Sequence, residues 1–240
     1  MNGQMRRRDK IERVRLLSNE RATPTTRIIR VALDGAVFPY RAGQAASLAA
    51  GDAAGWTPYS IASSPSETAR DAALEFLIKV DGSSRFGRIV DGLQLGDRIR
   101  VEGPAGNFTL SDSMPTTPLL FIAGGTGIAP VRSMIRDLVD ARHSAPLALV
   151  YSARTPSEFA YLQELRGLAD EGRLALTLTL TGDAADWAHA RGRTGPDHLS
   201  DLVTPETLAY ICGPPAMVRD VPAALTSIGF PRARIRTEDW

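Results

Sequence analysis

Apolar and polar residues alternate over short segments in the first half of the chain, which is the pattern of half-buried β-strands. Turn signals such as Asp34-Gly35 and Asp81-Gly82 separate these segments. The pattern predicts strands at Ile11–Leu17, Arg27–Leu33, Ser47–Ala50, Tyr59–Ala62, Leu74–Val80 and Arg98–Glu102, and a helix at Phe86–Leu93. Short strands at such close spacing predict a small antiparallel β-barrel or sandwich.

The pattern changes after Met114–Pro118, a proline- and threonine-rich segment that is typical of a linker. Continuous apolar segments now alternate with segments of helical period. They predict strands at Leu119–Ala123, Leu147–Tyr151, Leu174–Leu180, Tyr210–Cys212 and Arg234–Arg236, and helices at Ile128–Val139, Ser157–Leu168 and Pro214–Ser227. Such alternation predicts an α/β doubly wound parallel sheet with helices on both faces. We therefore expect two domains, residues 1–112 and residues 113–240.

Composition supports a soluble protein of two domains. The length of 240 residues suits two domains of about 100–150 residues each. No apolar segment approaches the roughly 20 residues of a membrane span, so we expect a cytoplasmic protein with no membrane partner. The single cysteine, Cys212, excludes an internal disulfide, a cysteine-ligated metal site and a fused iron–sulfur ferredoxin domain within this chain.

Charge is distributed unevenly along the chain. The first 110 residues carry 16 Lys and Arg against 12 Asp and Glu, and the remainder carries 12 against 15. A basic face on the first half would steer an acidic partner, whereas the plainer interpretation is a solvated surface. No basic patch with interleaved aromatic residues occurs, so we expect no nucleic-acid binding.

The segment GGTGIAP, Gly124–Pro130, follows the first parallel strand and opens a helix. Its glycines permit a tight turn and a close approach of phosphates to backbone N–H groups, and the helix N-terminus favours negative charge. It is not a P-loop, because no Gly-Lys-Ser/Thr follows. By itself the segment is equally compatible with a turn that serves only packing.

Two further segments carry candidate chemistry. ICGPPAM, Ile211–Met217, ends a strand at the edge of the sheet where α/β proteins bind ligands. There Cys212 is either a buried small hydrophobic residue or a ligand contact. The C-terminus, Glu238 to Trp240, ends on a large aromatic that either covers something flat or docks on the barrel.

Together these segments resemble the ferredoxin–NADP reductase superfamily, from about Val31 to Trp240. The matching motifs, in order, are FPYRAGQ (Phe38–Gln44), PYSIAS (Pro58–Ser63), GDRIRVEGPAGNF (Gly96–Phe108), GGTGIAP, YSART (Tyr151–Thr155), CGPPAM and the terminal EDW. Their order and spacing are specific as a set. The resemblance implies a flavin-binding antiparallel barrel followed by an NAD(P)-binding α/β domain, with FAD as cofactor and NADH or NADPH as co-substrate.

The resemblance also implies residue roles. Tyr59 would lie against the isoalloxazine and Ser60 would hydrogen-bond near flavin N5. The implied flavin-binding set is Pro58, Tyr59, Ser60, Ile78, Val80, Arg85, Phe86, Gly87 and Arg88.

In the second domain the resemblance implies a nicotinamide nucleotide site. Its implied members are Gly124, Gly125, Thr126 and Gly127 at the phosphates, Arg154 near the adenosine half, and Cys212, Gly213, Pro214 and Met217 in the CGPPAM turn. Glu238 would complete the hydride-transfer site, and Trp240 would cover the flavin and move aside for the nicotinamide. The implied catalytic residues are Ser60, Cys212, Glu238 and Trp240.

Three positions depart from the family pattern or leave it open. Thr57 stands where the family has an Arg that pairs with a flavin phosphate, which predicts weaker flavin binding unless Arg85 or Arg88 substitutes. Gly87 stands where the phosphate-binding turn usually has Ser or Thr. Asp183 disfavours the 2′-phosphate of NADPH, although Arg191 and Arg193 nearby would favour it.

The resulting prediction is an FAD-dependent oxidoreductase that transfers hydride from NAD(P)H to flavin N5. It would pass electrons to a separate one-electron acceptor protein, such as an acidic ferredoxin, a flavodoxin or an oxygenase component. Two alternatives stay open. One is a reductase of free flavin or small molecules, which Thr57 favours. The other is a flavin-poor, non-catalytic module, against which Ser60, Cys212 and Glu238 count.

Overall fold

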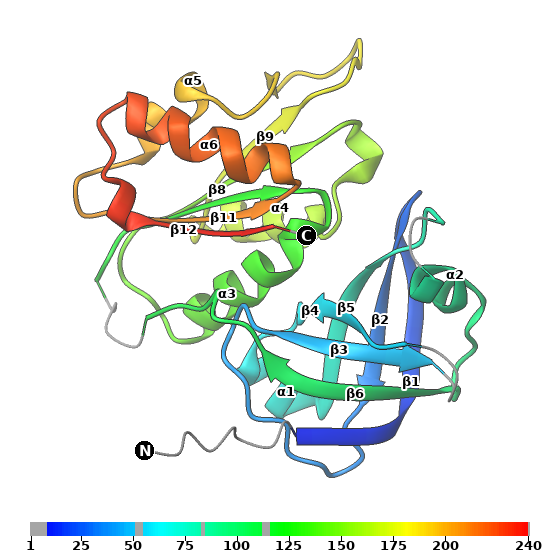
Figure 1. The fold of residues 1–240 in the computed structure, drawn as a ribbon. Helices are drawn as coiled ribbons and strands as arrows, with labels where there is room; N and C mark the ends of the chain where they lie inside the picture. The colour runs from blue at the N-terminus through cyan, green and yellow to red at the C-terminus, as the bar shows by residue number, and fades with distance from the viewer. Residues whose placement is uncertain (1–8, 51–54, 83–84, 112–115, 240) are drawn as a thin grey trace.

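The computed structural model describes residues 9–50, 55–82, 85–111 and 116–239. Figure 1 shows an antiparallel barrel below and to the right of a parallel sheet that helices cover, with the C-terminal strand ending where the two bodies face each other. Trp240 and the predicted domain boundary at residues 112 and 113 lie outside the described residues, so both stay predictions.

Within the described residues, the first sheet has six strands in the order β4-β3-β6-β1-β2-β5, and every neighbouring pair is antiparallel. They are β1 (Asp9–Thr23), β2 (Thr26–Ala32), β3 (Ala45–Ala50), β4 (Thr57–Ser60), β5 (Ala73–Lys79) and β6 (Arg98–Ala105). Ile61, just after β4, bridges Phe76 of β5, and the Ala62 N–H donates to the Glu75 carbonyl oxygen at 2.8 Å. The edge strands therefore meet and the sheet closes into the predicted barrel.

Two short helices belong to the barrel domain. They are α1 (Pro65–Asp71) and α2 (Arg85–Gly92). Phe86 and Val90 of α2 enter the barrel core together with the inward-facing strand residues, for example Ile29 and Val31 of β2. The apolar alternation of the strands thus determines which side chains fill the barrel, and α2 covers it.

The second sheet, counted over the described residues, has six parallel strands in the order β10-β9-β8-β7-β11-β12. They are β7 (Leu119–Gly124), β8 (Leu147–Ala153), β9 (Ala175–Leu180), β10 (Ala190–Arg191), β11 (Leu208–Gly213) and β12 (Ile235–Asp239). The helices are α3 (Ile128–Asp140), α4 (Leu162–Asp170), α5 (Pro196–Leu199) and α6 (Pro215–Ser227).

Strand β7 shows how this sheet is buried on both faces. Leu119 and Phe121 pack in one apolar cluster with α3 and α4, whereas Leu120 and Ile122 pack in another with α6. All six residues of β7 are buried. A strand buried on both faces is continuously apolar, and this explains the sequence pattern that predicted a parallel sheet.

The structure corrects several element predictions. Strand β1 runs on to Thr23 through a polar segment, and the Asn19 side chain there donates to the carbonyl oxygens of Val90 and Leu93 at the end of α2. The predicted helix start at Ser157 is wrong, because α4 begins at Leu162. The intervening Phe159 packs in the core on Tyr151 instead of continuing a helix.

Other elements carried weak signals. Helix α1 was not predicted, although Ser64 and Glu67 form the reciprocal capping box that marks a helix start. Strand β10 and helix α5 were also not predicted, and both are too short for an apolar period to show.

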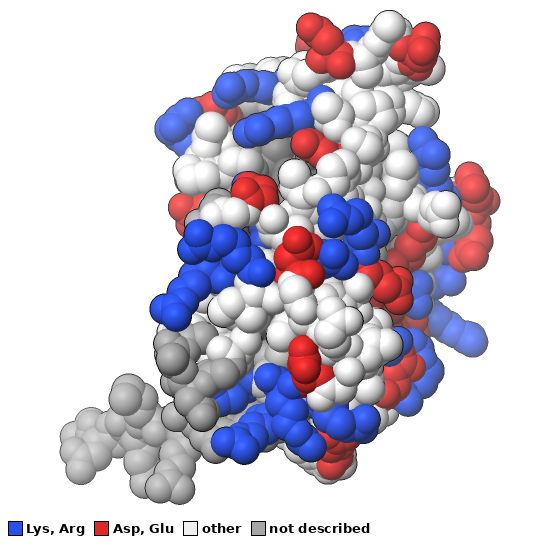
Figure 2. All heavy atoms as spheres, turned by 90° about the vertical axis from the view of Figure 1, so that its right-hand side faces the viewer, with Lys and Arg blue, Asp and Glu red and all other residues white. Residues whose placement is uncertain are grey.

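The two domains share one apolar cluster. Ala42, Leu77 and Phe108 of the barrel pack with Met134 and Ile135 of α3. On the face in Figure 2, basic and acidic side chains are mixed rather than separated into single-sign patches. None of the helices that the structure describes is long and apolar enough to cross a membrane.

Candidate active site between the barrel and the nucleotide-binding sheet

Two turns at the carboxyl edge of the second sheet pack against each other. A methyl group at Gly127 would lie 2.2 Å from the Cys212 carbonyl oxygen, and one at Gly213 would lie 2.7 Å from the Met217 sulfur. At Gly124 it would lie 3.0 Å from Pro214. Gly127 is therefore required by the contact between the GGTG turn and the CGPP turn, because a side chain there would meet the Cys212 backbone, whereas at Gly124 and Gly213 it would first meet the Met217 side chain.

A cavity of about 720 Å³ lies in front of these turns, between the sheet and the barrel. Six of the predicted nucleotide residues line it: Gly124, Gly125, Thr126, Arg154, Pro214 and Met217. Gly127, Cys212 and Gly213 lie behind this wall and are buried. The volume is within the range of small-molecule and cofactor sites.

The opposite wall of the cavity comes from barrel residues that the sequence did not predict. Thr23, Thr25 and Thr26 at the β1–β2 turn line it, with Lys79 and Asp81 at the end of β5. The Lys79 ammonium lies 2.9 Å from the Asp81 carboxylate. Only the closure of the barrel against the sheet brings these residues to the cavity, so no local motif marks them.

The cavity also bears on co-substrate choice. Arg154 and Arg193 are exposed and line it, with Thr181 and Gly182 between them on the wall. Asp183, the residue that disfavoured a 2′-phosphate, is not part of the lining. The lining also holds the acids Glu158 and Asp220, and Arg193 lies 3.8 Å from the Asp220 carboxylate, so the choice between NADH and NADPH stays open.

The predicted flavin residues form a second group. Tyr59 of β4 and Phe86 of α2 are in contact, with ring centroids 5.4 Å apart and ring planes at 41°. Pro58 is exposed and Ser60 half-buried on the same strand. Tyr59 and Ser60 are consecutive on β4, and their roles towards a flavin stay predictions.

The remaining flavin candidates are placed unequally. Arg85 and Arg88 are exposed on α2, where a helix start favours an anion. Gly87 is buried as the third residue of this helix, so it is not in the turn before it. Val80 is half-buried, but Ile78 is fully buried in the barrel core and offers no exposed atom to a cofactor.

Cys212 and Glu238 are neighbours on adjacent parallel strands, β11 and β12. A methyl group at Gly106 of the barrel would lie 3.9 Å from the Glu238 Oε1 atom, so this carboxyl group faces the other domain. Burial, and then the charge of Asp239, raise the pKa of Glu238 to about 7. Burial, and then the charges of Glu238 and Asp239, raise the pKa of the Cys212 thiol well above its usual range. Cys212 is therefore a neutral thiol and not an ionised nucleophile.

Comparison with known proteins agrees with this geometry. The oxidoreductase FAD-binding domain matches residues 13–110 and the oxidoreductase NAD-binding domain matches residues 121–222. Ferredoxin–NADP reductase B of Sorangium cellulosum is 33% identical over 240 residues, which cover 95% of this chain and 91% of that protein. This chain belongs to the ferredoxin–NADP reductase superfamily.

One further relative and one solved structure are also similar to this chain. The propane 2-monooxygenase reductase component of Mycolicibacterium smegmatis is 33% identical over 190 residues, 75% of this chain and 53% of that protein. A ferredoxin NADP+ reductase structure from Neisseria gonorrhoeae, with bound FAD and NADP, has a TM-score of 0.80 at 23% identity, covering 96% of this chain and 98% of that one. The chain spans about half the length of the first curated relatives it matches.

Membership in the ferredoxin–NADP reductase superfamily confirms the predicted fold, a flavin-binding barrel followed by an NAD(P)-binding α/β domain. It also confirms FAD and a nicotinamide dinucleotide as the molecules that the two domains bind. The matched ranges leave the predicted boundary at residue 112 between them. The roles of individual site residues stay predictions.

The glycine contact yields a test with a matched control. Gly127→Ala places a methyl group 2.2 Å from the Cys212 carbonyl oxygen, so we expect a loss of about 1–3 kcal/mol of stability or more, with weakened nicotinamide binding. Gly167→Ala, in the open middle of α4, meets no atom within 4 Å and should raise stability by up to about 1 kcal/mol. Thermal unfolding of both variants measures the difference. Equal effects would show that the turn contact is not tight.

The raised pKa of Glu238 predicts a pH-dependent stability. The folded state favours the protonated carboxyl group, so its contribution is full below the unfolded value of about 4.5 and is lost as pH rises through about 7. Glu238→Gln keeps the shape without the charge. We expect the Tm of the variant relative to the natural protein to rise by a few degrees between about pH 5 and pH 8. A difference that is constant across this range would contradict the shifted pKa.

Proposed function

We propose that the protein oxidises NADH or NADPH through bound FAD and passes the electrons to a separate acceptor protein. The observation that carries the proposal is the meeting of three parts at one edge. Glu238 and Cys212 end adjacent strands, Gly127 packs on Cys212, and the Glu238 carboxyl group faces Gly106 of the barrel. This edge is where the ends of a flavin site and a nicotinamide site have to meet.

Different residues of the chain would bind the nicotinamide dinucleotide and orient the flavin. Bound flavin supplies the chemistry of accepting a hydride and releasing electrons one at a time. The Gly124–Gly127 turn and the start of α3 would hold phosphates of the dinucleotide, while Tyr59 and Ser60 would orient the flavin ring. The buried thiol of Cys212 would present a neutral surface to the nicotinamide. Transfer requires reacting atoms within about 3–3.5 Å, so positioning is the main contribution of the protein.

The proposed acceptor is a separate one-electron carrier, either a ferredoxin or an oxygenase component. In support, relatives of this chain are named as reductase components of propane 2-monooxygenase, phenol 2-monooxygenase and terephthalate 1,2-dioxygenase. The single cysteine of the chain cannot hold an iron–sulfur cluster by itself.

Reduction of the FAD-loaded protein tests the proposal directly. The purified protein is incubated with FAD, passed through a desalting column and mixed without oxygen with NADH or NADPH. We expect a yellow protein whose flavin absorbance is bleached by at least one of the two nucleotides, and transfer onward to cytochrome c. A protein that takes up no FAD, or whose flavin neither nucleotide reduces, would refute the proposal.

A reductase of free flavin is a second candidate, and Thr57 is the observation that favours it. Thr57 begins β4 opposite Leu48, at the position where an Arg would pair with a flavin phosphate. Without that pair the flavin would exchange as a substrate. A flavin dissociation constant in the micromolar range or weaker would support this reading.

Thr57→Arg tests the cause of any weak flavin binding. A charge-assisted, bidentate contact contributes about 1.5–3 kcal/mol, so we expect flavin affinity to rise about tenfold or more. Thr57→Lys, which brings the charge without the planar fork, should give a smaller gain. Titration of the apoprotein with FAD, followed by flavin fluorescence, measures both. Unchanged affinity in both variants would show that Thr57 does not face the phosphate.

A further inference from the structure

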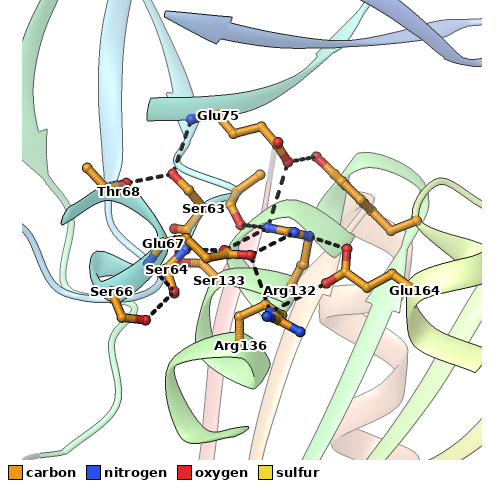
Figure 3. Close-up of polar contacts among 12 residues, drawn as sticks. Ser63, Ser64, Ser66, Glu67, Thr68, Glu75, Arg132, Ser133, Arg136 and Glu164 are labelled. Atoms are coloured by element: carbon orange, nitrogen blue, oxygen red, sulfur yellow. Dashed lines mark hydrogen bonds and ion pairs between the residues drawn. The ribbon is translucent and has the colours of Figure 1, made fainter. Parts of the chain in front are cut away.

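A second group of polar residues joins the two domains beside the cavity, and none of its members lines it (Figure 3). At its centre is Arg132 on the second turn of α3, which is only 7% exposed. Its guanidinium donates twice to the Glu67 carboxylate of α1, each at 3.1 Å, and once to Glu164 of α4 at 2.9 Å. Glu75 of β5 lies 3.7 Å away. One buried cation therefore binds carboxylates of both domains.

The same part of α3 also binds the backbone directly after β4, the strand that carries Tyr59 and Ser60. Arg132 donates to the Ala62 carbonyl oxygen at 2.8 Å, and the fully buried Ser133 hydroxyl donates to the Ser63 carbonyl oxygen at 2.6 Å. Two consecutive side chains thus bind two consecutive carbonyl groups. Ala62 and Ser63 come two and three residues after Ser60, the proposed donor near flavin N5.

The other end of the connection is the nucleotide turn. Helix α3 begins at Ile128, directly after the Gly125–Gly127 turn, and Arg132 follows only one helical turn later. A hydrogen-bonded helix transmits position rigidly over such a short distance. The strand that carries Tyr59 and Ser60 is therefore tied to the turn that would bind the nicotinamide dinucleotide.

This pattern of bonds is better suited to fixing the relative position of the two domains than to stabilising the fold. A buried ion pair adds little net stability, because desolvation of both groups offsets most of their attraction. Its bonds are directional, however, and here the bonded groups are also held by further hydrogen bonds. Glu67 also caps α1 through the Ser64 N–H at 2.8 Å, and the Ser63 carbonyl oxygen accepts a second bond from Tyr40 at 2.8 Å. We call Arg132 and Ser133, with their partners Glu67, Ala62 and Ser63, the interdomain clamp. Because Glu67 and the Ser63 carbonyl group are also held by these further bonds, neither is free to rotate alone.

We propose that Arg132 and Ser133 are positioning residues that hold strand β4 and the Gly124–Gly127 turn in the relative position that hydride transfer requires. The inference rests on the proposed function, because the distance between the reacting rings is what the clamp would maintain. An error of about 1 Å in such a distance costs about a hundredfold in rate. The clamp would therefore affect the rate of flavin reduction more than the binding of either nucleotide.

Three variants separate alignment from general stability. Arg132→Lys keeps the charge but loses the paired donors, and Ser133→Ala removes one interdomain bond. Arg173→Lys is the matched control, because Arg173 donates to the Val139 carbonyl oxygen of the same helix at 2.7 Å, but within one domain. Each FAD-loaded protein is mixed with saturating NADH or NADPH in a stopped-flow instrument. Flavin affinity, KM and Tm are measured in parallel.

We expect Arg132→Lys to lower the rate of flavin reduction about tenfold or more, and Ser133→Ala by a smaller factor. The charge-transfer absorbance between stacked nicotinamide and flavin should fall with the rate, whereas flavin affinity and KM should change less than about threefold. Arg173→Lys should leave the rate and the absorbance unchanged. Variants that lose Tm while keeping the natural rate and absorbance would overturn the proposal.

A second measurement does not depend on activity. The Ile61 and Ala62 N–H groups donate to the carbonyl oxygens of Gln44 and Glu75. Hydrogen exchange of a peptide covering residues 61–64 should speed up about tenfold in Arg132→Lys and not in Arg173→Lys. Unchanged exchange would overturn the clamp. If the natural protein is not reduced by either nucleotide, the proposed function fails and this exchange measurement alone decides the clamp.

Discussion

The charge on Arg132 is the interaction around which the two domains are arranged. Burial by itself would lower the pKa of this side chain, but the carboxylates of Glu164 and Glu75 outweigh that effect, so the guanidinium remains charged. Glu67 and Glu164 also lie 3.3 Å and 3.7 Å from Arg136, so the carboxylates of this cluster have more than one cation. The barrel domain presents Glu67 on α1 and the second domain presents Glu164 on α4 to the same cation. These ion pairs join the domains in addition to their shared apolar cluster.

Close contact between glycines sets the second constraint. At Gly127 two chain reversals lie so near each other that backbone atoms of Cys212 and Gly213 fill the space a side chain would need. The strands that lead into these turns, β7 and β11, are buried on both faces and cannot shift to make room. The carboxyl edge of the sheet is therefore rigid, and the cavity in front of it has a wall of backbone groups. Backbone N–H groups at such a turn, directly before a helix, are suited to binding phosphates.

Burial also shapes the chemistry of the strand ends. Cys212 and Glu238 lie side by side, and loss of water raises the pKa of both groups. The thiol stays neutral, and the carboxyl group changes its charge near neutral pH. Strongly shifted groups are typical of functional sites, and here burial is the main cause of both shifts, with the charge of Asp239 as a further cause.

Local patterns in the sequence determined the strands, the succession of an antiparallel and a parallel sheet, and the glycine turn. Apolar and polar residues alternate in β2, which indicates one buried face, and β7 is continuously apolar, which indicates two. Both patterns lie within a few consecutive residues. The capping pair Ser64 and Glu67 was also present in the sequence, but seven residues of helix give no apolar period to confirm it. Tertiary structure alone decided that Lys79 lines the cavity, that Ile78 turns into the barrel core and that Arg132 reaches Ala62. These contacts join residues far apart in the chain, and their geometry depends on closing the barrel and packing it on the sheet, which no local period records.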